Sequence, residues 1–189
     1  DVDPLPNGNL LATTARAGET AIFEFDPDTR ERVWTERFDI EDTHDADLLP
    51  NGDLVVANMR ATTDGVPDDK VFIYNRTTDE RTWEWRFRDH YPESTDGGYD
   101  EDWTHVNDVD YIGDDQFLLS PRNFDQAIVV NRSTGDIDMR LGSDGDYDTL
   151  HEQHNPDYLT PTPRTTASSS TSARATAGTG RGPSAPRGA

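Results

Sequence analysis

Short apolar runs, separated by turn residues, recur along the chain and predict an all-β protein. Residues 10–12, 54–57 and 117–120 form one equivalent set of apolar runs, and each is entered through a tight turn, Asn-Gly twice and Asp-Asp once. Further runs follow at 21–25, 71–74 and 127–130, and then at 32–34, 82–85 and 137–140. β-Branched and aromatic residues dominate these runs, which favours strands over helices.

The runs belong to an internal repeat. Residues 43–56 and 104–119 carry the same phrase, a copy that starts in mid-phrase lies at 3–12, and another begins at 151–159. Repeats of four short antiparallel strands are typical of propeller blades. The pattern predicts an all-β β-propeller fragment of about three four-stranded blades plus the start of a fourth. A β-sandwich is the alternative, but it needs no internal repeat.

The charge is strongly acidic. The chain has 38 Asp and Glu against 17 Lys and Arg, for a net charge of -21, and Lys70 is its one lysine. Such a surface suits a halophilic organism, because at molar salt the Debye length falls to about 3 Å and self-repulsion is screened. The same charge excludes nucleic acid as a natural partner.

Compartment and redox environment are left open by the sequence. With no cysteine, disulfides and thiolate metal sites are excluded. No run approaches the roughly 20 apolar residues that cross a bilayer. The chain opens without Met and in mid-motif, so we expect a missing N-terminal segment, and the full-length protein could be exported or membrane-anchored.

Composition divides the chain at residue 159. Residues 1–159 form the predicted partial propeller, whereas 160–189 lack Asp and Glu and consist largely of Thr, Ser, Ala, Gly, Pro and Arg. Such a segment cannot build a core and predicts a disordered C-terminal tail. Residues 160–189 are either the product of a shifted reading frame or a natural flexible linker.

Two smaller features have a structural and a functional interpretation. Asn75 and Asn131 match the N-glycosylation pattern, yet they occupy the same turn of successive blades, where turn chemistry favours Asn. The acidic insertion at 90–102 could hold Ca²⁺, but it lacks the ligand spacing of a known loop. We therefore interpret it as a solvated loop.

Candidate chemistry lies at the blade starts. His44, His105 and His154 (or His151) head successive blades, and Arg122 follows the next strand of the third blade. Each histidine alone could simply cap a strand, and three together could bind zinc. Because a guanidinium beside them disfavours a cation, the set predicts an anion site at one end of a central channel, with no metal.

These phrases resemble the PAPS-independent arylsulfotransferases, in particular the haloarchaeal members. The resemblance covers about residues 1–159 and rests on residues 44–52, on 104–110 with 120–122, and on 152–156. It implies a six-bladed propeller that moves a sulfuryl group from a phenolic sulfate ester to a phenol. No cofactor or nucleotide donor takes part, and the intermediate is a sulfohistidine.

Site roles follow from the resemblance residue by residue. His154 would be the nucleophile, with Gln153 before it and His151 as a close competitor. The resemblance implies a sulfuryl-binding and catalytic shell made of His44, His105, Asn107 and Arg122.

Two other hypotheses stay open. One is a non-catalytic propeller that binds a ligand or a protein, since fold alone does not give function. The other is a fragment without activity. The sequence indicates neither the donor and acceptor nor the oligomeric state.

Overall fold

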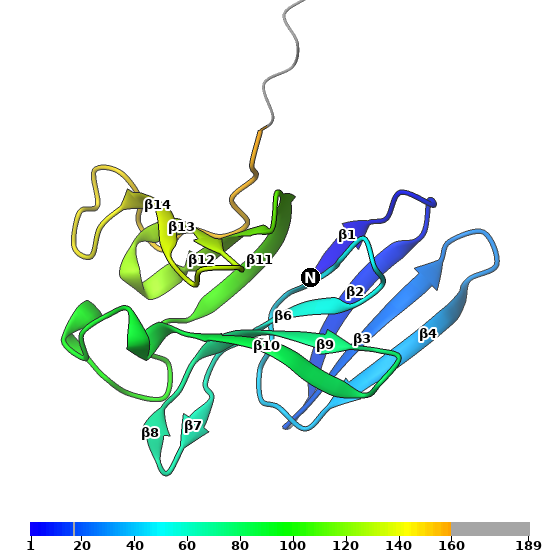
Figure 1. The fold of residues 1–189 in the computed structure, drawn as a ribbon, viewed down its shortest axis with the longest axis horizontal. Coiled ribbons are helices and arrows are strands. Elements are labelled where there is room, and N and C mark those ends of the chain that lie inside the picture. The colour runs from blue at the N-terminus through cyan, green and yellow to red at the C-terminus, as the bar shows by residue number, and fades with distance from the viewer. Residues whose placement is uncertain (17, 160–189) are drawn as a thin grey trace, which may run out of the picture. The chain divides into compact units, whose positions relative to one another are not determined.

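The computed structural model describes residues 1–16 and 18–159, and Figure 1 shows how its sheets are arranged. Within these residues the chain forms β-strands and three short 3-10 helices, and no α-helix is present. No helix of the described part is long and apolar enough to cross a membrane. The predicted disordered tail, 160–189, lies outside the described residues, so the domain division at 159 stays a prediction.

Three four-stranded antiparallel sheets follow one another along the chain. The first has the order β1-β2-β3-β4. Its strands are β1 (Val2–Pro4), β2 (Leu10–Arg16), β3 (Glu19–Asp26) and β4 (Glu31–Phe38). The second consists of β5 (Ala46–Leu48), β6 (Leu54–Asn58), β9 (Lys70–Asn75) and β10 (Glu80–Arg86), with a small hairpin of β7 (Thr62–Thr63) and β8 (Val66–Pro67) between β6 and β9.

The third sheet repeats the same up-and-down order. It consists of β11 (Val106–Gly113), β12 (Gln116–Pro121), β13 (Gln126–Asn131) and β14 (Ile137–Gly142). The 3-10 helices are η1 (Phe87–Asp89), η2 (Thr95–Gly97) and η3 (Arg122–Phe124). The predicted all-β propeller fragment is confirmed, with one blade for each of the three sheets.

The turns follow the predicted chemistry. Asn75 accepts backbone hydrogen bonds from Thr77 and Thr78 at 2.9 and 3.0 Å, and Asn131 accepts equivalent bonds from Ser133 and Thr134 at 3.0 and 3.2 Å. A side-chain oxygen that bonds the backbone two residues ahead closes an Asx turn. Turn formation therefore accounts for both asparagines.

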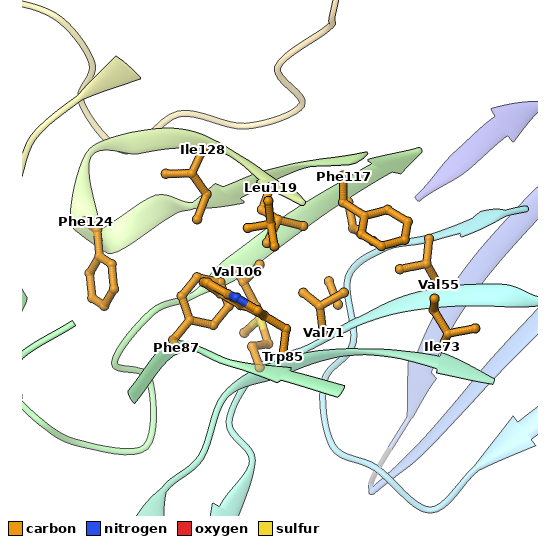
Figure 2. Close-up of a cluster of buried hydrophobic side chains, with 14 of the residues drawn as sticks. Val55, Val71, Ile73, Trp85, Phe87, Val106, Phe117, Leu119, Phe124 and Ile128 are labelled. Atoms are coloured by element: carbon orange, nitrogen blue, oxygen red, sulfur yellow. The ribbon is translucent and has the colours of Figure 1, made fainter. Parts of the chain in front are cut away.

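Hydrophobic layers lie between successive sheets. One cluster joins the first two sheets through Leu11, Ile22 and Phe72. A larger one joins the second and third sheets, and Figure 2 shows Val55, Trp85 and other members of it. Side chains alternate along a strand, so β6 sends Val55 and Ala57 into one layer and Leu54 and Val56 into the other. Strand β6 is consequently buried on both faces.

Aspartate side chains connect the innermost strands of neighbouring sheets. The backbone N–H of Val109 donates to Asp45 Oδ2 at 2.8 Å, and that of Tyr111 donates to Asp47 Oδ2 at 2.9 Å. A sheet edge presents unpaired N–H groups that need partners when buried. The repeated Asp-x-Asp phrase supplies those partners from the preceding sheet.

The predicted start of a fourth blade, residues 151–159, forms no strand within the described residues. A strand needs a neighbour to pair with, and the following residues lie outside the described part. This segment instead attaches to the third sheet: the Asn107 side-chain amide donates to the Gln153 carbonyl at 3.0 Å.

The acidic insertion is anchored rather than merely solvated. The hydroxyl of Tyr91 donates to Gln126 Oε1 at 2.8 Å, and the indole N–H of Trp103 donates to the Thr95 carbonyl at 3.0 Å. Tyr91, Thr95 and Trp103 are buried. Aromatic residues with satisfied polar groups hold the loop against the core. The insertion is therefore anchored at Tyr91 and Thr95 and by the adjoining Trp103. Its acidic residues Glu93, Asp96, Asp100 and Glu101 are exposed, as expected for a solvated loop.

Candidate active site

Histidines from three separate parts of the chain meet at one end of the sheets. His44 precedes β5, His105 precedes β11, and His154 follows β14. The ring centroids of His44 and His105 are 5.2 Å apart, and those of His105 and His154 are 6.5 Å apart. The structure thus brings together the three histidines that the sequence placed at blade starts.

An open cavity of about 390 Å³ adjoins this cluster. Its lining combines His44, His154 and Asn107 with polar groups of the first sheet and with Asp42. His105 and Arg122 are not among the lining residues. A small polar group would reach His44 and His154 directly.

Two aspartates and an arginine form a network behind the histidines. Nδ1 of His105 lies 3.0 Å from both carboxylate oxygens of Asp102, and Nε2 of His44 lies 3.6 Å from Asp42 Oδ1. The Arg60 guanidinium donates to both acids, from Nε to Asp102 at 3.0 Å and from the terminal nitrogen to Asp42 at 2.5 Å. Arg60 therefore fixes both carboxylates relative to each other.

The electrostatics of this network set the histidine tautomer. Burial acts to raise the pKa of Asp102, but hydrogen bonds from His105 and Arg60 outweigh it and hold the pKa below its usual value. An ionised carboxylate only accepts hydrogen bonds. Nδ1 of His105 therefore carries a proton, which leaves Nε2 free for chemistry when the ring is neutral.

His44 and His154 are disposed to be neutral. Burial lowers the pKa of His44, and the charge of Asp42 only partly opposes it. Burial likewise lowers the pKa of His154, and the positive charges of Arg122 and His105 lower it further. A neutral imidazole has a free lone pair, so His154 is suited to act as a nucleophile near neutral pH.

Arg122 lies in η3 beside the cluster. Its terminal nitrogens lie 2.8 Å from Glu152 Oε2 and 2.8 Å from Asn123 Oδ1. The Glu152 carboxylate is 52% exposed, and an exposed ion pair contributes only about 0–1 kcal/mol. An incoming anion can therefore replace Glu152 at low cost.

Asn107 and Gln153 have different positions relative to the histidines. Asn107 lines the cavity, and its side-chain oxygen is buried without a hydrogen-bond partner among the described residues. The Gln153 amide instead donates to Ser120 Oγ at 3.2 Å and to the Gln126 carbonyl. Gln153 therefore fixes the segment that carries His154.

His151 is separate from the cluster. Its ring packs on Tyr147 with a centroid distance of 4.5 Å, and Nδ1 lies 3.5 Å from Asp125 Oδ1. The side chain is 57% exposed. Of the two candidate nucleophiles in this segment, His154 is the one that lies beside His105.

Left-handed backbone conformations surround the site. His105 has φ 43°, and Glu152 and Asn155, on either side of His154, have φ 47° and 48°. Such conformations in non-glycine residues cost on the order of 1–3 kcal/mol each and concentrate at functional sites. Contacts with the third sheet and with Asp102 hold these residues in place.

Sequence reasoning missed Asp42, Arg60 and Asp102. One signal was present: an aspartate stands two residues before His44 and three before His105. The bridging role of Arg60 had no sequence signal, because it depends on a contact with Asp102 across 42 residues.

Taken together, the blades and the histidine cluster define a β-propeller protein with a polar, histidine-lined cavity at one end of its inner strands. The family model for Arylsulfotransferase (ASST) matches residues 1–172, and the chain belongs to this family. Membership of the haloarchaeal branch stays a prediction. No curated protein sequence matches the chain.

Two solved structures are similar in fold. A protein of unknown function from Bacteroides caccae matches with a TM-score of 0.50 and 11% identity, over 75% of this chain and 44% of that one. The beta-propeller domain of Cps50 (Swd1) from Myceliophteria thermophila gives a TM-score of 0.43 and 16% identity, over 74% and 39% of the two chains. The chain thus spans less than half the length of either structure.

Proposed function

We propose that the protein containing this chain transfers a sulfuryl group from a phenolic sulfate ester to a phenol through a sulfohistidine at His154. The observation that carries the proposal is the convergence of His44, His105 and His154 beside one polar cavity, in a chain of the arylsulfotransferase family. The lowered pKa of His154 supports its role as the nucleophile.

The reaction proceeds in two displacements. A ring nitrogen of neutral His154 forms a bond to sulfur as the bond between sulfur and the aryl oxygen breaks, and the phenolate leaves. The incoming phenol oxygen then forms the second bond to sulfur and releases His154. Both steps leave the sulfuryl group intact, and the order is ping-pong.

His105 is the proposed general acid and base. The Asp102 carboxylate holds Nδ1–H at 3.0 Å in both protonation states of the ring. In the imidazolium form, the Nε2–H protonates the leaving phenolate in the first step, and the neutral ring that results takes the proton of the phenol at Nε2 in the second. The positioning of an imidazole by a carboxylate follows the logic of hydrolase triads. His44, paired with Asp42, is the alternative for this role.

Charge on the transferring group needs stabilisation as well. The transition state spreads negative charge over the equatorial oxygens, as in phosphoryl transfer. Arg122, Asn107 and His44 would donate hydrogen bonds to those oxygens, with the guanidinium exchanging its Glu152 partner for the substrate. His151 and Gln153 would act on substrate binding only through the segment that carries His154.

We assign the activity to the whole protein, because this chain spans only part of the structures that it matches. Residues 1–189 alone are proposed to be inactive, since an incomplete ring of blades leaves the site open to water.

The test measures phenolate release from 4-nitrophenyl sulfate, with a phenol acceptor, in molar KCl. The full-length gene product should turn over, His154→Ala should abolish turnover, and His151→Ala should retain most of it. Unchanged turnover in His154→Ala, or its loss only in His151→Ala, would contradict the assignment. Absence of turnover in the full-length protein would favour a non-catalytic binding module.

A further inference from the structure

Carboxylates gather along the inner strands next to the histidine cluster, and Asp1 lines the same cavity as His44 and His154. Each inner strand carries or follows an Asp-x-Asp phrase: Asp1 and Asp3 at β1, Asp45 and Asp47 at β5, and Asp108 and Asp110 at β11. Residues two apart on a strand face the same side of the sheet. The repeat therefore directs a pair of carboxylates from each blade to the same part of the fold.

Three of these side chains are close enough to share one ion. Asp1, Asp3 and Asp45 each place a carboxylate oxygen within 4.8 Å of the other two. Asp45 is only 2% exposed. Its Oδ2 accepts the Val109 N–H, whereas Oδ1 is buried and has no hydrogen-bond partner in the described part of the chain.

Asp108, on β11 of the third sheet, adds a fourth carboxylate to this cluster. It is 4% exposed, and its Oδ2 is also buried without a partner among residues 1–16 and 18–159. Burial raises its pKa to about 8, and the nearby charges of Asp45, Asp110 and Asp3 add to the effect. Burial likewise raises the pKa of Asp45 to about 7.

Among the described residues, no positively charged side chain neutralises these four aspartates. None of Asp1, Asp3, Asp45 or Asp108 forms an ion pair within 4.0 Å with a lysine, arginine or histidine there. A buried carboxylate is protonated, paired or bound to a metal, because an isolated buried charge is costly. The unpartnered oxygens of Asp45 and Asp108 therefore require either protons or a cation.

We propose that this cluster is a calcium site, with Asp1, Asp3 and Asp45 as direct ligands and Asp108 as a further ligand or a hydrogen-bond acceptor for a bound water. Oxygen-only donors suit a hard cation, and Ca²⁺ accepts six to eight oxygens in flexible geometry. Bound Ca²⁺ would join the inner strands of successive blades. It would also reduce the negative charge beside His44, where a sulfate ester must approach. The site does not depend on the proposed sulfuryl transfer.

Calcium binding to the full chain gives the test. Protein stripped with a chelator is titrated with Ca²⁺ by calorimetry in buffered KCl, and its thermal unfolding is followed with and without Ca²⁺. We expect saturable binding and a higher Tm with Ca²⁺. Asp45→Asn should weaken binding by at least about tenfold, as loss of metal-site groups commonly does, because Asn still accepts the Val109 N–H but carries no charge.

Asp64→Asn is the matched control. Asp64 is exposed at the tip of the β7–β8 hairpin with φ 55°, a conformation that Asn tolerates. This variant removes the same charge and should bind Ca²⁺ like the parent protein. If Asp45→Asn does not fold, as judged by far-UV circular dichroism, Asp108→Asn is used instead, with weaker binding again expected.

Equal unfolding with and without Ca²⁺, and no heat of binding, would overturn the proposal. So would binding that Asp45→Asn and Asp64→Asn weaken equally, because that pattern indicates diffuse attraction to an acidic surface. A third result would also overturn the proposal: Asp45→Asn or Asp108→Asn is more stable than the parent protein, and Ca²⁺ does not change the Tm. In that case the buried carboxyl groups are protonated rather than bound to a cation.

Discussion

Asp102 holds the imidazole of His105, with both carboxylate oxygens 3.0 Å from Nδ1. The two side chains are three residues apart, and the left-handed backbone of His105 turns its ring back toward the acid. Arg60, in the loop after β6, fixes the same carboxylate. The pair gives His105 a defined tautomer and a free second nitrogen, which general acid–base catalysis requires.

Replacing Asp102 tests the role of this pair. Asp102→Asn keeps the size of the side chain but removes the charge that stabilises the protonated ring, so turnover of the full-length protein should fall by about 10²-fold. The loss should be in kcat and should be smaller with donors whose phenolate is a better leaving group. An equal loss with all donors would contradict a role in proton transfer and indicate a structural role.

Arg122 should control the protonation of His154. Burial and the charges of Arg122 and His105 lower the pKa of His154 below 6.5. Removing the guanidinium with Arg122→Gln stabilises the imidazolium, so the pKa of His154 should rise. Histidine ring resonances, titrated by NMR in the full chain, measure this shift without any need for activity.

Arg132→Gln is the control for that titration, because Arg132 lies on an outer turn and pairs with Asp115. Its substitution should leave the His154 titration unchanged. In the full-length protein, Arg122→Gln should also lower the transfer rate by about 10²–10³-fold, the usual cost of losing one preorganised donor. A His154 pKa that stays the same in Arg122→Gln would show that the two groups are not coupled.

The buried ion pair of the second sheet should dominate local stability. The Lys70 ammonium lies 2.6 Å from Asp68 Oδ2, with 9% and 0% of the two side chains exposed. Asp68→Ala leaves the buried ammonium with only Glu84 at 3.6 Å and also removes the 3.0 Å partner of Arg88. It should therefore lower the free energy of unfolding by about 3–5 kcal/mol. Urea unfolding measures this difference.

Glu19→Ala provides the comparison for Asp68→Ala. Glu19 pairs with Arg37, but both side chains are more than half exposed. Loss of this exposed ion pair should lower the free energy of unfolding by at most about 1 kcal/mol. Equal effects of the two substitutions would contradict the assignment of Asp68 and Lys70 as a buried pair.

The contact between Asp47 and Tyr111 should contribute to the docking of the second and third sheets. Asp47→Ala leaves the Tyr111 N–H without its acceptor, and an unsatisfied buried donor costs about 1–3 kcal/mol. Asp47→Asn retains an acceptor oxygen, so it should keep most of the free energy of unfolding that Asp47→Ala loses. If Asn and Ala are equally destabilising, the charge of Asp47 matters rather than the hydrogen bond.

Local chemistry made much of the fold predictable. The apolar runs, the turns at Asn75 and Asn131, and the repeat itself depend on neighbouring residues, and each predicted sheet formed. The convergence of His44, His105 and His154 followed from their equivalent places in the repeat, because equivalent positions in successive blades lie near a common axis.

Contacts between distant residues were not predictable in the same way. Arg60 reaches Asp42 and Asp102, 18 and 42 residues away in the chain, and no local pattern marks that geometry. The sequence also could not separate His154 from His151, because both follow the third blade within four residues. The hydrogen bonds that tie Glu152 and Gln153 to the third sheet place His154 toward His105, and they depend on contacts between distant residues.

The central claim is that His154 accepts the sulfuryl group. The most direct measurement incubates the full-length protein with 4-nitrophenyl sulfate without an acceptor and maps the modified residue by mass spectrometry under non-acidic conditions. We predict one sulfuryl group on the peptide that contains His154, absent in His154→Ala, retained in His151→Ala and lost when a phenol is added. Modification of His151, or phenolate release without any modified histidine, would contradict the account.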